Sequence, residues 1–285
     1  MRLALLAALA LLLASAAAQE SVALWPEGAP GSEGFENVPE SAADWWVRDV
    51  HAPSLTVFAP EQPNGTAIVV VPGGGHENVV WPSEAVRPAQ WLAERGVTAF
   101  ALKYRLARQP GSPYDIETDA AADLRRAMRW VRSHAEDYGL DPERIGVLGF
   151  SAGGELVNLV TYGPTEGDEA SNDPTERVSA RPDFQVQIYP GPIGLPDRFT
   201  QEPPPAFFVT AFGDEGPELT ISRHLAMYRK AGVPAEVHVY AHGAHAFNMG
   251  TRSDLRSLKA WPGRLEDWLA DSGYLGGVEA APPAP

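Results

Sequence analysis

A single serine stands between glycines in the segment GFSAG, residues 149–153. A buried-type apolar run, 145–148, precedes this segment, and a pattern typical of a helix follows it. A sharp strand-to-helix turn of this kind holds the hydroxyl of Ser151 out for attack, and the first amides of the helix can then bind an oxyanion. A turn without chemistry has the same five residues, so the assignment depends on partners elsewhere in the chain.

A serine hydroxyl becomes a nucleophile when a histidine accepts its proton. His242 and His245 lie in the segment AHGAHAF, directly after a predicted strand. Ligands of open parallel sheets bind beyond this end of the strands. We therefore expect His245 to be the base and keep His242 as the alternative. His134 and His224 are expected at the surface, and His238 is expected inside a strand.

The imidazole in turn needs a carboxylate that fixes its tautomer and stabilises its charge. Asp214 follows the predicted strand AFFVTAF, and the adjacent Glu215 could replace it. The order Ser151, Asp214, His245 is the one used where such a serine turn follows a parallel strand. The alternative for Asp214 is an acidic residue that merely begins a helix before Pro217.

A run of three glycines follows another apolar strand, in the segment VVVPGGGHEN. Glycines at this place let backbone amides approach a ligand closely. We expect the amides of Gly74, Gly75 and Ala152 to form an oxyanion hole. A dinucleotide site is the competing interpretation, but Asn78 occupies the position of its third glycine, and no phosphate-binding G-x-x-x-x-G-K-[ST] motif occurs.

The elements that must position these residues alternate between strands and helices. The predicted strands are 55–60, 67–71, 97–104, 144–150, 184–190, 206–212 and 235–241. The predicted helices are 83–95, 116–138, 152–162, 217–231 and 255–270. Residues 19–53 are read as an irregular lead-in and 163–182 as an inserted loop. This alternation predicts an α/β fold with a mostly parallel sheet and helices on both faces.

The ends of the chain differ in composition from its middle. Residues 1–18 carry one basic residue and an apolar run that ends in small residues, which is typical of a secretory signal peptide. We expect one domain over 19–272, a flexible tail over 273–285, and a secreted or periplasmic protein without a membrane segment after cleavage. The oligomeric state is left open.

The chain has 285 residues, a formal net charge of −15 and no cysteine. An acidic surface repels nucleic acid and anionic lipid, so we expect neither as a partner. The absence of cysteine excludes thiol catalysis and cysteine-based zinc sites. We expect no metal and no cofactor.

Several segments together carry a resemblance to a known family. They are PGGGH, LKYRL, DPERIGVLGFSAGG, RPDFQVQIYP and AGVPAEVHVYAHGAHAF. The chain resembles the alpha/beta-hydrolase superfamily over about residues 22–270, nearest to the acetylxylan-esterase and feruloyl-esterase-like branch related to hormone-sensitive lipase. The resemblance implies a Ser-His-Asp serine esterase. Its matching positions are Ser151, Asp214 and His245 for the triad, and Gly74, Gly75 and Ala152 for the oxyanion hole.

The chain departs from its relatives at three places. Glu155 stands where relatives commonly have histidine or a small residue, DEGPEL replaces their sequence around the acid, and Pro72 precedes the glycines in place of a histidine. These differences leave the triad complete. They bear on the substrate subgroup, and the role of Glu155 is left open.

The expected substrate is an ester with a short acyl group. The stretch between Tyr189 and Ala206 is too short for a large lid, and His76, Asn78 and Trp81 are candidates to line the pocket. Trp81 is equally compatible with a supporting role in the core. We expect acetylated carbohydrate such as acetylxylan first and a feruloyl or general carboxylic ester second. A serine peptidase and a non-catalytic glycan-binding protein of the same fold are the alternatives.

Overall fold

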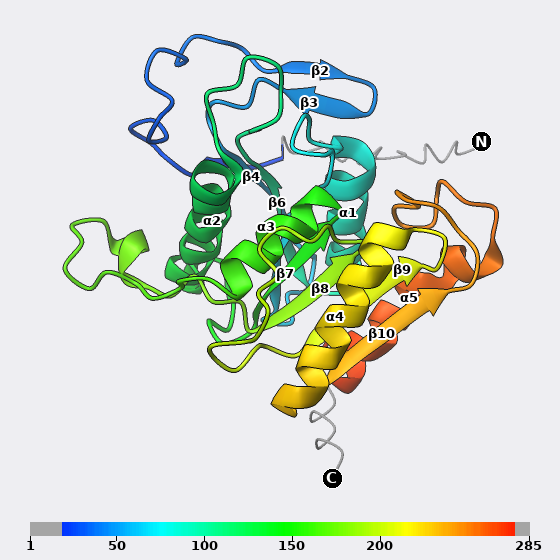
Figure 1. The fold of residues 1–285 in the computed structure, drawn as a ribbon. Coiled ribbons are helices and arrows are strands. Elements are labelled where there is room, and N and C mark those ends of the chain that lie inside the picture. The colour runs from blue at the N-terminus through cyan, green and yellow to red at the C-terminus, as the bar shows by residue number, and fades with distance from the viewer. Residues whose placement is uncertain (1–18, 277–285) are drawn as a thin grey trace, which may run out of the picture.

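The computed structural model describes residues 19–276, which form one eight-stranded sheet with helices on both faces (Figure 1). The strand order is β1-β4-β6-β5-β7-β8-β9-β10. The strands of this sheet are β1 Ser21–Ala23, β4 Ser54–Phe58, β5 Ala67–Val71, β6 Thr98–Lys103, β7 Ile145–Phe150, β8 Phe184–Ile188, β9 Ala206–Ala211 and β10 Ala235–Tyr240. The α-helices are α1 Arg87–Ala93, α2 Ala121–Ser133, α3 Ala152–Thr161, α4 Glu215–Ala231 and α5 Arg256–Asp271.

Six neighbouring strands run parallel: β6, β5, β7, β8, β9 and β10. Strand β4 is antiparallel to β6, and β1 is antiparallel to β4. Every residue of β5, β7, β8 and β9 is buried. Strands covered by helices on both faces read as continuous apolar runs, and AIVVV in β5 is the clearest example. The predicted α/β fold is confirmed, and the predicted strands match the observed ones to within one or two residues at most of their ends.

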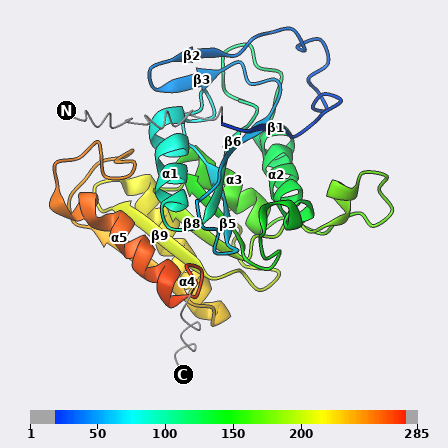
Figure 2. The ribbon, with the colours of Figure 1, turned by 180° about the vertical axis from the view of Figure 1, so that it is seen from behind.

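The two faces of the sheet have separate cores. Helices α2 and α3 pack on one face through residues such as Leu124 and Val157, and α4 extends this layer through Ile221. Helices α1 and α5 cover the other face, where Trp261 is completely buried (Figure 2). All parallel strands therefore end at one edge, above which their loops meet.

The segment 19–53 is irregular over most of its length, as expected, but it also includes three short strands that the sequence did not predict. It contains β1 at the sheet edge and a separate hairpin of β2 Ser41–Ala43 and β3 Trp46–Arg48. A single antiparallel bridge joins Val47 of β3 to Val79, just after the glycine triplet. Three-residue strands carry too little sequence pattern to be read in advance.

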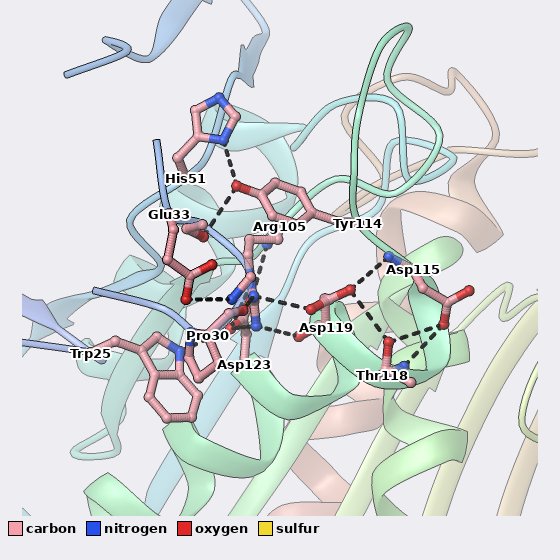
Figure 3. A network of polar contacts seen from close by, with 12 residues as sticks. Trp25, Pro30, Glu33, His51, Arg105, Tyr114, Asp115, Thr118, Asp119 and Asp123 are labelled. Atoms are coloured by element: carbon pink, nitrogen blue, oxygen red, sulfur yellow. Dashed lines mark hydrogen bonds and ion pairs between the residues drawn. The ribbon is translucent and has the colours of Figure 1, made fainter. Parts of the chain in front are cut away.

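A buried ion pair anchors this segment to the sheet (Figure 3). Arg105 follows β6 and is 1% exposed, and its guanidinium lies 2.8 Å from Asp123 of α2, which is completely buried. The indole of Trp25 donates to the same carboxylate at 2.9 Å, and Arg105 also donates to the carbonyl of Pro30 and to Asp119. Arg105 thus joins the lead-in, the sheet and α2.

Two predicted helices contain other helical turns. The segment predicted as 83–95 begins with a π-helical turn, Pro82–Val86, before α1. The segment predicted as 116–138 consists of a π-helical turn Ile116–Ala120, α2, and a 3₁₀ turn Glu136–Tyr138. The inserted loop 163–182 holds one 3₁₀ turn, Pro174–Arg177.

The structure extends beyond the predicted C-terminal end of the domain, residue 272. Residues 273–276 belong to the packed body, because the Tyr274 ring stacks 3.9 Å from Phe184 and its carbonyl accepts a hydrogen bond from Thr66. The predicted start of the tail at 273 is therefore too early. The predicted signal peptide 1–18 and residues 277–285 lie outside the described residues. Within 19–276, no helix has the length and apolarity needed to cross a membrane.

Candidate active site

Ser151 occupies the sharp turn between β7 and α3. Its backbone has φ 49° and ψ −116°, a region that residues other than glycine rarely adopt, and its amide donates to the carbonyl of Ile188 at 3.0 Å. A Cβ on Gly153 would lie 2.1 Å from the carbonyl oxygen of Val71, and one on Gly149 would lie 2.7 Å from Gly153. The two glycines therefore let α3 approach the strands closely enough to form the turn.

The predicted catalytic side chains meet at the carboxyl edge of the sheet. Ser151 Oγ lies 2.8 Å from His245 Nε2, and His245 Nδ1 lies 2.6 Å from Asp214 Oδ2. Asp214 follows β9 and His245 follows β10, so neighbouring parallel strands bring them together. The His245 side chain is 44% exposed and that of Asp214 is 11% exposed, so the arrangement is open to solvent on the histidine side.

Each of the two alternatives left open by the sequence lies outside this chain of hydrogen bonds. Glu215 is exposed at the first position of α4, and His242 is exposed three residues before His245. One of the surface predictions is wrong, because His224 is completely buried beside the Phe208 ring. Its place on α4 faces β9 rather than solvent, which the charged residues around it in the sequence obscured.

The glycine loop after β5 has the backbone geometry of an anion site. Gly74, Gly75 and His76 have φ values of 127°, 66° and 61°. A Cβ on Gly74 would lie 2.0 Å from the carbonyl oxygen of Asn78, so this position requires glycine. Among residues 19–276, the amides of Gly74 and Gly75 have no hydrogen-bond partner, and Ala152, as the first residue of α3, has no intrahelical partner.

Two of the three predicted pocket residues, His76 and Asn78, are buried in the glycine loop, which corrects the expectation that they line a pocket. His76 is completely buried and Asn78 is 7% exposed, because the backbone after the glycines turns inward. His76 Nε2 lies 2.8 Å from Glu155 Oε2. Trp81 is half-buried between the two cores, and Lys103 Nζ lies 5.1 Å from its ring centre.

The partner of His76 is Glu155, the residue at which the chain departs from its relatives. Glu155 lies one helical turn after Ser151 and is 7% exposed. Its other oxygen accepts from the amide of Ile193 at 3.3 Å. Glu155 thus holds the far end of the glycine loop against α3 and the loop after β8.

A second buried carboxylate near the site, Glu84, was not anticipated from the sequence. It lies in the π-helical turn and is 2% exposed. Its Oε2 accepts from the amide of Gly73 and its Oε1 from the hydroxyl of Tyr189, both at 2.9 Å. Burial raises the pKa of Glu84, and these hydrogen bonds and the charge of His245 oppose that rise. A glutamate two residues after a proline is typical of a solvent-exposed helix start, so no sequence signal distinguishes Glu84.

The fold agrees with comparisons to known proteins. A family model described as BD-FAE matches residues 55–194, which include the glycine loop and Ser151. An acetylxylan esterase of Xylanibacter ruminicola is 28% identical over 232 residues, which cover 69% of this chain and 44% of that protein. The chain therefore spans less than half the length of this relative.

Two solved structures extend the comparison over most of the chain. The acetyl ester-xyloside bifunctional hydrolase from Caldicellulosiruptor lactoaceticus is 28% identical with a TM-score of 0.75, over 90% of this chain and 98% of that one. Thermogutta terrifontis esterase 2, phosphorylated by paraoxon, is 27% identical with a TM-score of 0.64, over 80% of this chain and 92% of that one.

A strand-turn serine followed by an acid and a histidine after the next strands, on this sheet, defines an alpha/beta hydrolase. The solved structures share the fold over nearly their whole length. Within that superfamily, residues 55–194 match the BD-FAE family model, and the chain is similar to an acetylxylan esterase.

Proposed function

We propose that this protein is a serine carboxylic-ester hydrolase that removes short acyl groups, acetyl first, from carbohydrate such as acetylxylan. The observation that supports it most directly is the unbroken chain of hydrogen bonds from Ser151 Oγ through His245 to Asp214. The proposal assigns the nucleophile to Ser151, the base to His245 and the acid to Asp214.

The chemistry follows from this geometry. His245 Nε2 accepts the proton of Ser151 as the hydroxyl oxygen bonds to the ester carbonyl carbon. The negative oxygen of the tetrahedral intermediate binds the amides of Gly74, Gly75 and Ala152, and one good donor there contributes about 3–4 kcal/mol. The imidazolium then returns the proton to the leaving alcohol. Water, activated by His245, releases the acid from the acyl-enzyme in the same way.

The substrate class rests on the openness of the site and on the similarity to acetyl-ester hydrolases. The side chain of His245 is 44% exposed, and residues 189–205 form no helix that could act as a lid. A shallow site accepts a bulky alcohol such as a sugar chain and offers little surface to a long acyl chain. The similar acetylxylan esterase and acetyl ester-xyloside hydrolase suggest acetylated xylan or xylosides.

The proposal does not invoke a metal or a cofactor. Among residues 19–276, no three side chains of histidine, aspartate or glutamate gather as a metal would require. We further propose a secreted or periplasmic location, for which the apolar segment 1–18 is the support. Export would bring the protein to polysaccharide substrates.

Acetate release from acetylated xylan tests the function, together with p-nitrophenyl acetate, butyrate and longer esters. We expect acetate release and the fastest cleavage of the shortest esters, with Ser151→Ala inactive on every substrate. Preference for long acyl chains would reject the short-acyl specificity. Faster cleavage of methyl ferulate than of any acetyl ester would favour a feruloyl esterase.

A non-catalytic glycan-binding protein is the alternative from another class. In that case the wild type and Ser151→Ala would bind xylan equally well, and neither would hydrolyse any ester. A peptidase would release amines from p-nitroanilide peptides, and this activity would also depend on Ser151. Absence of hydrolysis of every ester would contradict the proposed function, and faster cleavage of p-nitroanilide peptides than of any ester would favour the peptidase.

A further inference from the structure

Glu84 is a completely enclosed carboxylate that the triad chemistry does not use, yet it touches two parts of the site. It lies in the turn Pro82–Val86 and is 2% exposed. A buried carboxylate without a cationic partner in hydrogen-bond contact is costly unless donors surround it. The hydrogen bonds of Glu84 therefore indicate which parts of the protein it holds in place.

The first contact is with the glycine loop. The amide of Gly73 donates to Glu84 Oε2 at 2.9 Å, and the amide of Val80 donates back to the carbonyl of Gly73 at 3.0 Å. A Cβ on Gly73 would lie 2.8 Å from Glu84 Oε2, so nothing larger than glycine fits between them. These bonds fix the peptide plane directly before Gly74 and Gly75, whose amides are the proposed oxyanion donors.

The second contact is with the histidine loop. Tyr189 donates its hydroxyl hydrogen to Glu84 Oε1 at 2.9 Å, and its ring packs edge-on against His245 at 4.9 Å between ring centres. The backbone amide of Asn248, three residues after His245, donates to the Tyr189 hydroxyl at 3.0 Å.

The side chain of Asn248 completes the connection. In the orientation that satisfies its neighbours, its Nδ2 donates to Glu84 Oε1 at 2.7 Å and to the carbonyl of Ala246 at 3.0 Å. Its Oδ1 then accepts from Ser83 Oγ at 2.9 Å. Asn248 is 1% exposed, so these bonds are shielded from water and each partner is needed.

We propose that Glu84 is a positioning residue that holds the oxyanion loop and the histidine loop in one fixed relation. It acts through Gly73 on the first loop and through Tyr189 and Asn248 on the second. It touches neither the substrate nor the reacting atoms. The inference rests on the proposed esterase function, because it states that the relative position of the two loops affects the rate of ester hydrolysis.

The carboxylate is suited to this place because its neighbours are donors. The amide of Gly73, the hydroxyl of Tyr189 and the amide nitrogen of Asn248 all offer hydrogens. Glutamine has nearly the same shape but replaces one acceptor oxygen with an NH₂ group. Glu84→Gln therefore places a donor against donors and loosens one of the two loops without opening a cavity.

The test compares Glu84→Gln, Tyr189→Phe and their double variant with the wild type in steady-state hydrolysis of p-nitrophenyl acetate. A loosened oxyanion hole lowers kcat by about 10- to 100-fold and leaves KM within about twofold, because the loss arises in the transition state. Tyr189→Phe, which removes only the connecting hydroxyl, is expected to lower kcat in the same way. The double variant is expected to be no slower than the slower single variant, because both interrupt one connection.

Glu94→Gln is the matched control, because Glu94 is an exposed glutamate at the end of α1. It is expected to keep the wild-type kcat and KM. Active-site titration with an organophosphate and thermal unfolding normalise each rate to folded enzyme. Because Tyr189→Phe keeps the carboxylate, the inference is tested even if Glu84→Gln folds poorly.

Three outcomes would overturn the inference. The first is a kcat for Glu84→Gln within about twofold of wild type while Ser151→Ala is inactive. The second is a rise in the KM of Glu84→Gln with its kcat unchanged. The third is a double variant whose fold-decrease in kcat equals the product of the decreases in the two single variants. The first leaves the proposed function standing. If Ser151→Ala keeps the wild-type rate, the function itself fails, and this inference fails with it.

Discussion

At the scale of single residues, the serine turn combines strain with close approach. Ser151 has φ 49°, and Gly153 approaches the carbonyl of Val71 so closely that a Cβ would lie 2.1 Å away. The strain costs on the order of 1–3 kcal/mol and persists because the surrounding strands and helix determine the turn. The segment GFSAG, residues 149–153, is thus needed for the packing of the turn as well as for the proposed chemistry.

Gly153→Ala tests that packing requirement. Because the added methyl meets the backbone of β5, we expect the substitution to displace α3, lower the melting temperature and reduce kcat/KM by at least about tenfold, given that small displacements of reacting groups are costly. Gly263→Ala in α5 is the control, since a Cβ there meets nothing within 4 Å. It should keep full activity and gain up to about 1 kcal/mol of stability. Equal effects of the two changes would contradict the explanation.

Asp214→Asn tests the assignment of the acid. The side chain keeps its shape but no longer favours a proton on His245 Nδ1, so His245 Nε2 loses its role as acceptor from Ser151. We expect kcat to fall by about 10³–10⁴-fold with little change in melting temperature. The corresponding change Glu215→Gln should be silent in the same assay. Activity that depends on Glu215 and not on Asp214 would reverse the assignment.

The hydrogen-bonded arrangement of the proposed triad could be predicted from the sequence, because chain order and the positions after strands restrict the choice. Ser151, Asp214 and His245 each follow a strand with an apolar pattern, and parallel strands end at one edge. Glu84 could not be predicted in this way. Its role depends on long-range contacts to Tyr189 and Asn248, which no local pattern encodes.

At the scale of elements, the lead-in and α2 are joined through the ion pair of Arg105 and Asp123. Arg105 also extends the junction to Pro30 and Asp119 (Figure 3). Burial raises the pKa of Asp123, and its hydrogen bonds with Arg105 and Trp25 oppose that rise. The short strands of the lead-in could not be predicted from the sequence, because this side-chain junction holds the segment in place and no periodic hydrophobicity marks it.

Asp123→Ala tests how much this junction contributes. The change leaves the Arg105 guanidinium buried without its main partner, and loss of one member of a buried pair costs about 3–5 kcal/mol. We expect urea unfolding to show this decrease in the free energy of unfolding. Asp254→Ala, which breaks an exposed pair with Lys259, should change it by less than about 1 kcal/mol. Similar losses for both variants would contradict the structural role of the junction.

At the scale of the whole molecule, the buried histidine of α4 links stability to pH. His224 is completely buried, and burial lowers its pKa from 6.5 to about 4. Between these values the unfolded chain binds a proton that the folded protein excludes. Stability is therefore expected to fall as the pH decreases through 6.5 toward 4.

Urea unfolding of wild type and His224→Gln at pH 7 and pH 4.5 measures this effect. We expect the wild type to lose about 2–3 kcal/mol more than the variant between the two pH values. The variant itself is expected to be less stable at pH 7, where the neutral imidazole packs against Phe208. An identical decrease in both proteins would assign the acid sensitivity to other groups.

The proposed active site lies at the carboxyl edge of a sheet whose central strands are completely buried. The glycine loop, Ser151, Asp214 and His245 come from four parallel strands, so the fold sets the distances between them. The central claim is that Ser151 forms the acyl-enzyme in ester hydrolysis.

Covalent trapping of the nucleophile tests that claim most directly. The protein is incubated with paraoxon, and intact mass and peptide mapping locate the adduct while residual p-nitrophenyl acetate hydrolysis is measured. We predict one diethyl phosphoryl group per chain, on Ser151, with loss of activity in proportion to labelling and no labelling of Ser151→Ala. Full labelling at another residue, or undiminished hydrolysis by a fully phosphorylated Ser151, would contradict the assignment.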